Sequence, residues 1–291
     1  MRHSTTFLMS LIVASILVLM FLNLVLGSVS IPLKSVWNII CGLGDEPVTW
    51  QNIVWKSRLP QALTALVAGA GLAISGLQMQ TVFRNPLAGP SVLGISSGAS
   101  MGVAFVVLLS GSLGGVALSK LGFMGEIALS IAAVIGSLSV MALIVYVSQK
   151  VKGNVTLLII GVMIGYVANA VIGVLKFFSV EEDIRAYVIW GLGSFSRVSG
   201  NQMMLFVAIM AILIPLSFLL IKTLNLMLLG DGYARNLGLN IKRARLLVIT
   251  SAGVLTAIVT AYCGPVIFLG LAVPHPVSYT HLRAHETRED L

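Results

Sequence analysis

Charged residues are scarce in this chain, and so are cysteines. Of the 291 residues only 10% are charged, whereas 57% are hydrophobic and the mean hydropathy is +1.01. Soluble globular domains carry about 25% charged residues, so the composition excludes that class and indicates an integral membrane protein. The two cysteines, Cys41 and Cys263, have neither metal-ligand nor redox spacing, and we interpret both as free thiols.

Basic patches and phosphate-binding motifs are also missing. The formal net charge is +8, but the lysines and arginines are spread over short polar segments, which argues against nucleic-acid binding. The chain has no G-x-x-x-x-G-K-[ST] loop, so it has no phosphate cradle of its own for ATP. The glycines at 69, 71 and 76 lack the strand and the acidic residue of a dinucleotide-binding loop. We therefore expect no cofactor and no metal bound by this chain.

Long apolar runs dominate what is present. Each main run is near the ~20 residues that a helix needs to cross the hydrocarbon core of a bilayer. The sequence thus predicts an all-α polytopic membrane protein in contact with membrane lipid, with about eight spans and an uncleaved first span. The spans are expected at residues 7–26, 61–82, 91–109, 126–147, 155–178, 203–221 and 246–262, with a short eighth at 266–273. Residues 30–56, with three tryptophans and turn residues, are predicted to form short amphipathic helices at the interface.

The second and third runs are rich in small residues and are joined by a polar connection. Small side chains let helices approach closely where lipid supplies no hydrophobic drive, so both runs are expected inside a bundle. The connection contains Arg84, Asn85, Pro86, Leu87, Gly89 and Pro90, and Gly94 follows near the start of the third run. The ordered stretch RLPQALTALVAGAGLAISGLQMQTVFRNPLAGPSVLGISSGASMG resembles the FecCD-type permease subunits of ABC importers for iron-siderophores, haem and vitamin B12.

This resemblance implies a ten-helix importer-permease fold in the bacterial inner membrane, working as a homodimer or as a dimer with a paralogue. It also implies two cytoplasmic ATPase subunits, which carry ATP and Mg, and an extracytoplasmic substrate-binding protein as partners. The chain would then be a transporter subunit and not an enzyme, importing an iron-siderophore, haem or a corrinoid. An ion-coupled secondary transporter is the alternative, but it requires a buried carboxylate, and no Asp or Glu lies well inside a predicted span.

The segment LGDGYARNLGLN at residues 229–240 resembles the coupling helices of the family, which seat in a groove of the ATPase. The expected coupling residues are Gly230, Asp231, Gly232, Ala234, Arg235, Asn236, Leu237 and Gly238. Asp231 is predicted to cap the helix that follows, with Arg235 one turn later. An ordinary cytoplasmic loop is the other interpretation. A small excess of basic residues places the N-terminus and this segment in the cytoplasm.

By the same resemblance, Arg58 and Lys56 are expected to dock the binding protein on the opposite side of the membrane. Arg58 could instead anchor its span at the interface. In the fifth run, Gly165 and Asn169 lie on a face of small residues that could line a pathway or pack against a neighbour. The acidic segment 181–187 could be a solvated loop or part of a docking surface.

Gly264, Pro265, Gly270, Pro274 and His275 match the eighth helix of the family, and the breaks at 89–94 and 264–270 suggest a weak internal repeat. After them no apolar run follows where two further spans are expected. We therefore interpret residues 1–275 as a C-terminally truncated permease domain and residues 276–291 as a non-native tail. This interpretation predicts that the chain does not transport until a ninth and a tenth helix are grafted after His275.

Overall fold

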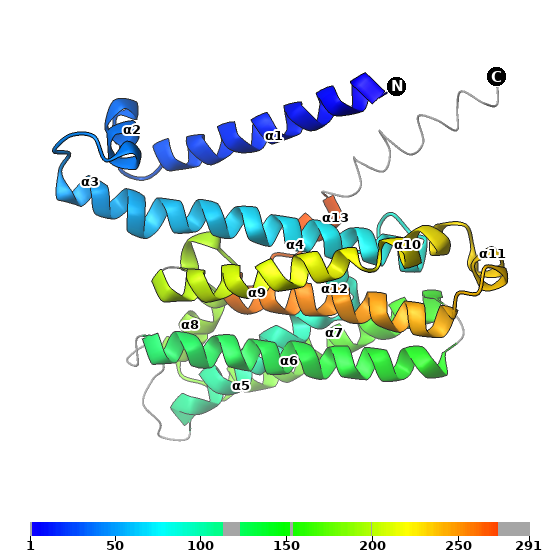
Figure 1. Cartoon of the computed structure of the whole chain (residues 1–291). Coiled ribbons are helices and arrows are strands. Elements are labelled where there is room, and N and C mark those ends of the chain that lie inside the picture. The colour runs from blue at the N-terminus through cyan, green and yellow to red at the C-terminus, as the bar shows by residue number, and fades with distance from the viewer. Residues whose placement is uncertain (1, 113–122, 152–153, 199, 273–291) are drawn as a thin grey trace. The chain divides into compact units, whose positions relative to one another are not determined.

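The computed structural model describes residues 2–112, 123–151, 154–198 and 200–272, and within these ranges the protein is helical and contains no strand (Figure 1). The chain divides into two compact units. The first comprises Met1–Leu66 and Phe195–Leu205, and the second comprises Val67–Ser194 and Phe206–Leu291.

The helices begin and end as follows. The first part of the chain contains α1 (Arg2–Val25), α2 (Leu33–Cys41), α3 (Val48–Ile53), a π-helical turn (Val54–Arg58) and α4 (Leu59–Phe83). The middle contains a 3₁₀ turn (Pro90–Leu93), α5 (Ile95–Ser112), α6 (Phe123–Lys150), α7 (Asn154–Phe177), α8 (Glu181–Gly191) and a second 3₁₀ turn (Phe195–Arg197). The last part contains α9 (Gly200–Phe218), α10 (Ile221–Leu228), α11 (Asp231–Asn236), α12 (Ile241–Cys263) and α13 (Leu269–Ala272).

Among the residues that the structure describes, four helical stretches are long and apolar enough to cross a membrane: Val48–Phe83, Met124–Lys150, Val155–Phe177 and Ile241–Cys263. The pair Gln202–Phe218 and Ile221–Leu228, bent by 46°, makes a fifth if it is counted as one span, and Met9–Val25 and Ile95–Leu109 are shorter apolar helices. A helix therefore occupies each of the seven long runs predicted from the sequence. At the predicted eighth the structure describes only the four residues of α13.

The prediction for residues 30–56 is wrong in part. A separate helix, α2, does form there, but residues 50–56 are not an isolated interfacial helix, because α3, the π-helical turn and α4 continue one another as Val48–Phe83. Pro60 explains the wider turn, since it cannot donate the backbone hydrogen bond to the preceding turn and a π-helical turn accommodates such a gap.

Small residues set the closest helix contact of the second unit, between α5 and α6. A Cβ atom added at Gly136 of α6 would lie 2.1 Å from the carbonyl oxygen of Gly98, and one added at Gly102 would lie 2.2 Å from that of Ala132. The two backbones therefore touch, as expected for an interior helix pair in lipid. Figure 1 shows α12 running alongside α6 in the same unit.

A buried polar tie joins α4 to α12. The Ser75 hydroxyl lies 2.8 Å from the Thr256 hydroxyl and donates to the carbonyl oxygen of Ala252 at 2.9 Å. Both hydroxyl side chains are almost completely buried. Such hydrogen bonds hold helices together where the surrounding lipid is as apolar as the side chains.

Candidate functional site

The predicted coupling segment forms a short helix between two glycine breaks. Gly230 has φ 104° and Gly238 has φ 85°, a left-handed region that favours glycine, and the six-residue α11 lies between them. Of the residues expected there, Ala234 is buried, whereas Gly232, Arg235, Asn236 and Leu237 are exposed. The short, exposed α11 is therefore bounded by a glycine break on each side.

The predicted cap at Asp231 is wrong. Gly230 occupies the cap position of α11, and the Asp231 carboxylate instead accepts a hydrogen bond from Arg84 Nη2 at 2.5 Å. Its second oxygen lies 3.7 Å from Arg245 Nη2 of α12, and no ion pair joins it to Arg235 within the described ranges. One carboxylate therefore links the end of α4, the start of α11 and the base of α12. We call Arg84, Asp231 and Arg245 the Asp231 triad.

The polar connection after α4 aims Arg84 at this carboxylate. Arg84 is a non-glycine residue with positive φ, at 48°, so α4 ends there in a left-handed conformation. The Asn85 side chain accepts from the Leu87 backbone N–H at 2.9 Å, and Gln80 Nε2 donates to the carbonyl oxygen of Pro86 at 2.9 Å. These bonds fix the turn, which is why Arg84, Asn85, Pro86 and Leu87 occur together.

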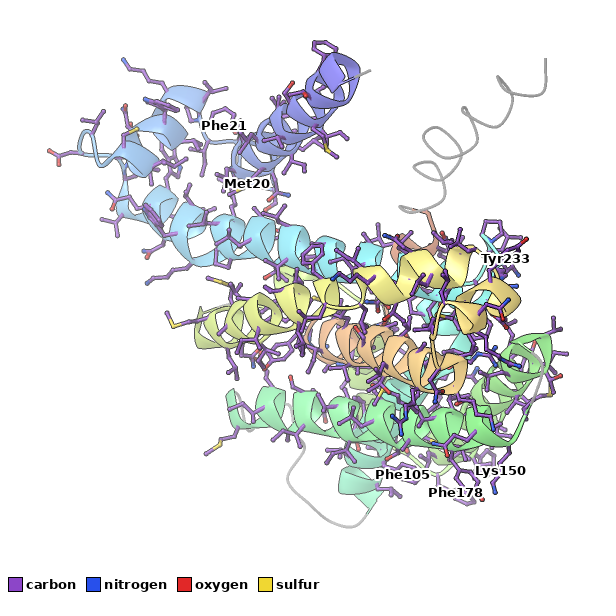
Figure 2. The ribbon with its side chains drawn as sticks, turned by 45° about the vertical axis from the view of Figure 1, so that its right-hand side comes forward. Met20, Phe21, Phe105, Lys150, Phe178 and Tyr233 are labelled. Atoms are coloured by element: carbon purple, nitrogen blue, oxygen red, sulfur yellow. The ribbon has the colours of Figure 1, made fainter. Side chains whose placement is uncertain are left out.

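Two functional candidates at this end were not recognised from the sequence. Arg245 belongs to the triad but lies on α12, beyond the segment 229–240 that was expected to couple. Tyr233 is 72% exposed and Leu237 is 62% exposed, four residues apart on α11, and Figure 2 shows Tyr233 projecting from that helix. Leu237 was already expected as a coupling residue, and its spacing from Tyr233 is the signal that could have identified Tyr233, since apolar pairs at this spacing anchor a helix in a partner's groove.

The two glycine-proline breaks of the sequence meet in the structure. A Cβ atom added at Gly270 would lie 3.0 Å from Pro90 Cγ, and one added at Gly89 would lie 3.5 Å from Leu271 Cβ. Gly94, with φ 74°, approaches the carbonyl oxygen of Gly161 on α7 so closely that its Cβ would lie 3.0 Å away. The break at 89–94 is therefore packed against both α7 and the break at 264–270.

A second glycine pair fixes the end of α12. Gly264 has φ 77°, and an added Cβ would lie 2.7 Å from the carbonyl oxygen of Trp190 and 2.9 Å from the Cα of Gly193. The Ser194 N–H donates to the carbonyl oxygen of Cys263 at 2.7 Å. Pro265 follows, so α12 cannot continue. Pro274 and His275 lie outside the described residues.

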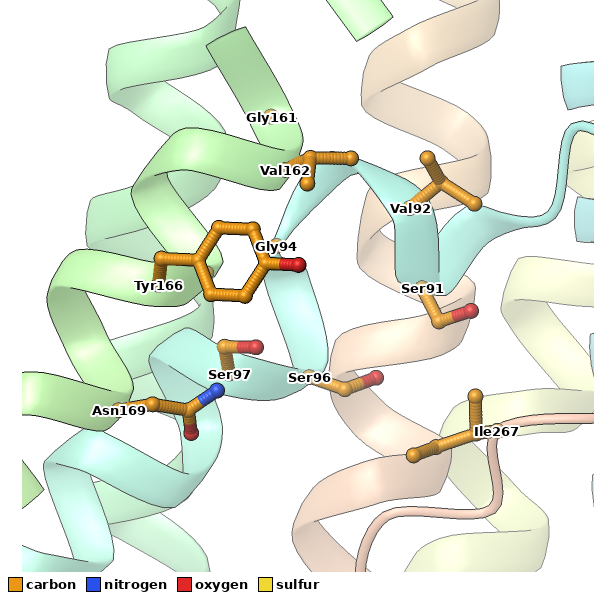
Figure 3. Close-up of a pocket in the computed structure, with 11 residues that line it drawn as sticks. Ser91, Val92, Gly94, Ser96, Ser97, Gly161, Val162, Tyr166, Asn169 and Ile267 are labelled. Carbon is orange, nitrogen blue, oxygen red and sulfur yellow. The ribbon is translucent and has the colours of Figure 1, made fainter. Parts of the chain in front are cut away.

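A pocket of about 270 Å³ opens where these breaks meet α7 (Figure 3). It is lined by Ser91, Val92, Gly94, Ser96, Ser97, Gly161, Val162, Gly165, Tyr166, Asn169 and Ile267. None of these residues is charged, and the polar groups are hydroxyls and one amide. In Figure 3 the side chains of Asn169 and Ser97 lie next to one another. The wall can therefore form weak hydrogen bonds with a polar solute but offers no fixed charge to retain an ion.

Gly165 and Asn169 play different parts in this wall. Gly165 is buried, and a Cβ atom there would lie 3.4 Å from Ser97 Oγ, so the glycine permits close packing of α7 on α5. Asn169 is exposed one turn further along the same face. Both residues therefore line the pocket, and Gly165 also packs α7 against α5.

Arg58 is not placed for docking. The side chain is only 5% exposed, and Nη1 donates to the carbonyl oxygens of Leu24 and Val25, both at 2.8 Å. Nη2 donates to Val29, and a Cβ atom at Gly27 would lie 2.8 Å from it. The guanidinium satisfies carbonyls that the end of α1 leaves unpaired. Neither docking nor anchoring at the interface fits this burial, whereas Lys56 is exposed.

The acidic segment at 181–187 forms the start of α8. Glu181 and Glu182 are exposed, but Asp183 is buried, and its Oδ2 has no hydrogen-bond partner within the described part of the chain. Burial raises the pKa of the Asp183 carboxyl, and the neighbouring Glu182 raises it further. This segment is thus neither a loop nor fully solvated.

Comparison with known proteins gives a consistent result. A model described as the FecCD transport family matches residues 15–287. The hemin transport system permease protein HmuU of Yersinia pestis is 34% identical over 252 residues, covering 86% of this chain and 72% of that protein. The vitamin B12 import system permease protein BtuC of Photorhabdus laumondii is 35% identical over 240 residues, covering 82% and 68%.

A solved structure shares the fold. A chain of a metal-chelate type ABC transporter in an inward-facing conformation has a TM-score of 0.74 at 27% identity, covering 91% of this chain and 78% of that one. The family match runs past residue 275, and the interpretation of residues 276–291 as a non-native tail stays a prediction.

Proposed function

Because the chain belongs to the FecCD transport family, we propose that it is the membrane-spanning permease subunit of an ATP-driven importer in the bacterial inner membrane. Its relatives are named as permeases for hemin and for vitamin B12, so the proposed substrate is haem, a corrinoid or a related iron chelate. The observation that carries the proposal is the protruding α11, which the Asp231 triad ties to two membrane-spanning helices. The buried carboxyl of Asp183 lies on α8, outside the candidate membrane spans, so it does not favour the ion-coupled transporter.

The α11 helix is the element that would seat in a partner ATPase, which binds ATP and Mg and hydrolyses the nucleotide. Its exposed Tyr233 and Leu237 supply apolar contact, and Arg235 and Asn236 supply polar contact at the rim. The Arg84 and Asp231 side chains are 46% and 42% exposed, and such a pair contributes only about 0–1 kcal/mol to stability. Its proposed role is therefore to transmit displacement of α11 to α4 and α12.

The uncharged pocket beside Gly94 is proposed to border the substrate pathway. Hydroxyl and amide groups without a fixed charge let a bulky chelate pass without being held. Tyr166 and Asn169 are exposed on α7, so in the proposed dimer of two permease copies, or of this chain with a paralogue, they would face the partner. Lys56 is the remaining candidate for docking an extracytoplasmic binding protein.

The test is reconstitution into proteoliposomes with the ATPase subunits inside and the binding protein outside. Uptake of haem, cobalamin and a ferric siderophore is measured for the 291-residue chain and for a version whose residues 276–291 are replaced by the last two helices of the hemin permease. ATP-dependent uptake of one of these substrates by the version with the two grafted helices, and not by the 291-residue chain, is the expected result. Uptake that persists without ATPase subunits would contradict the proposal.

The variant Asp231→Arg isolates the coupling step. It reverses the charge that faces Arg84 and Arg245, so we expect uptake to fall about tenfold or more while the protein still inserts and binds the ATPase. Asp45→Arg is the matched control, because Asp45 is exposed and lies far along the chain from α11. Unchanged uptake in Asp231→Arg would remove the triad from the coupling mechanism.

A further inference from the structure

A groove lined mainly by aliphatic side chains runs between α9 and α12. Its volume is about 570 Å³, within the size range of small-molecule sites, and all of its lining residues belong to the second unit. Leu216 and Leu220 form one wall, and Leu246, Leu247 and Val254 of α12 form the other. We call it the α9–α12 groove. None of its lining residues enters the pocket or the triad described above.

The bend between α9 and α10 keeps this groove open. Pro215 removes a backbone hydrogen bond within α9, and the chain turns by 46° between α9 and α10 a few residues later. The facing side chains are leucines, which hold the two helix backbones further apart than glycines would. A gap of this size inside a membrane is filled by lipid chains if no protein fills it.

Two cations lie at one end of the groove. Lys242 and Arg243 precede the groove-lining Leu246 and Leu247 by four residues each on α12, so they lie on the same side of that helix one turn nearer its start. Both are exposed, and neither has an ion pair within the ranges that the structure describes. Between residues 184 and 272 the sequence has one acidic residue, Asp231, and it faces Arg84 and Arg245.

We propose that the α9–α12 groove binds an anionic phospholipid, with an acyl chain along the leucine walls and the phosphate group at Lys242 and Arg243. Basic pockets between membrane helices on the cytoplasmic side select anionic headgroups in this way. The inference rests on the proposed function only for the orientation that places this end of α12 in the cytoplasm. Because α12 begins directly after the α11 segment, the bound headgroup would steady the base of the coupling element.

The test is native mass spectrometry of the purified 291-residue chain titrated with dioleoylphosphatidylglycerol or with dioleoylphosphatidylcholine, which have the same acyl chains. We expect the glycerol lipid to bind more tightly. The double variant Lys242→Gln with Arg243→Gln should weaken that binding about 25-fold and weaken binding of the choline lipid much less, since each cation near an anionic headgroup contributes about fivefold in affinity. The matched control removes two charges elsewhere, as Lys34→Gln with Lys150→Gln.

The apolar wall is tested by Val254→Trp, which fills the groove. This variant should weaken binding of both lipids, and a phosphatidylglycerol with a photoreactive acyl chain should label peptides of α9 and α12 in the unmodified chain. Equal affinity for the two lipids, labelling confined to other helices, or a double variant that behaves like its control would each overturn the proposal. Binding is measured without ATPase or transport, so its failure leaves the proposed function untouched.

Discussion

The α5–α6 pair and the α9–α12 pair both join apolar membrane helices but end in opposite arrangements. Along α5 and α6, Gly98, Gly102 and Gly136 bring the two backbones into contact. Along α9 and α12, leucines face one another and a groove of about 570 Å³ remains. Since lipid tails are as apolar as leucine, hydrophobicity cannot close either pair. The size of the facing side chains decides which helices touch.

Breaking the glycine contact should have the largest effect. In Gly136→Leu the new Cβ would lie 2.1 Å from the carbonyl oxygen of Gly98, and a backbone atom cannot move aside as a flexible side chain can. Overpacking of this kind typically costs about 1–3 kcal/mol and occasionally more, so we expect little monodisperse protein and a much lower thermal midpoint in detergent. Gly173→Leu is the control, since a Cβ there meets no atom within 4 Å. Equal stability of the two variants would show that α5 and α6 do not touch as described.

A smaller effect is expected from the polar tie that holds α4 to α12. Thr256→Val keeps the shape of the side chain but removes the hydroxyl 2.8 Å from Ser75, and hydrogen bonds between membrane helices contribute about 0.6 kcal/mol on average, up to about 1.7. The same change at Thr250, which lines the α9–α12 groove, should be nearly neutral. Thermal unfolding of both variants in one detergent makes the comparison. A larger loss of thermal stability in Thr250→Val than in Thr256→Val would show that the Ser75–Thr256 hydrogen bond does not stabilise this helix pair.

The smallest effect concerns α8, which carries the buried carboxyl group of Asp183. Burial raises the pKa of the Asp183 carboxyl above its ordinary value of 3.8. Above the raised pKa the buried carboxyl is charged, which lowers the free energy of unfolding. This loss of stability shrinks as the pH falls through the raised pKa and is absent below 3.8. We expect Asp183→Asn to stabilise the protein at pH 7 by roughly 1 kcal/mol or less, and the gain to vanish in acid.

Glu181→Gln serves as the control for this pH dependence, because Glu181 is exposed on the same helix. Thermal midpoints of the two variants and of the parent chain are compared between pH 4 and pH 7. A gain in Asp183→Asn that is the same at both ends of this range would mean that the carboxyl is not charged at a cost in the folded state.

The sequence predicted most of the helices and their breaks, but it did not predict which side chains far apart in the chain come into contact. The seven long apolar runs are mainly helical, and the glycines at 230, 238 and 264 have positive φ where breaks were expected. The break at Gly94 was not expected, because it lies inside the predicted third span. Two further errors concern charged side chains. Asp231 was expected to cap α11 but faces Arg84 and Arg245, and Arg58 was expected at a docking surface but is buried against the end of α1.

The sequence by itself determined that the chain is a bundle of apolar helices with defined breaks, because helix formation in lipid and glycine or proline breaks depend on neighbouring residues alone. Only the tertiary structure decided which distant groups meet. Arg84 and Asp231 are 147 residues apart, and the breaks at 89–94 and 264–270 are further apart still, yet each pair is in contact. The groove, too, depends on which side chains of α9 and α12 face one another, and no local pattern encodes that. Packing sets these contacts, because a charge pairs with whichever partner the folded backbone brings within reach.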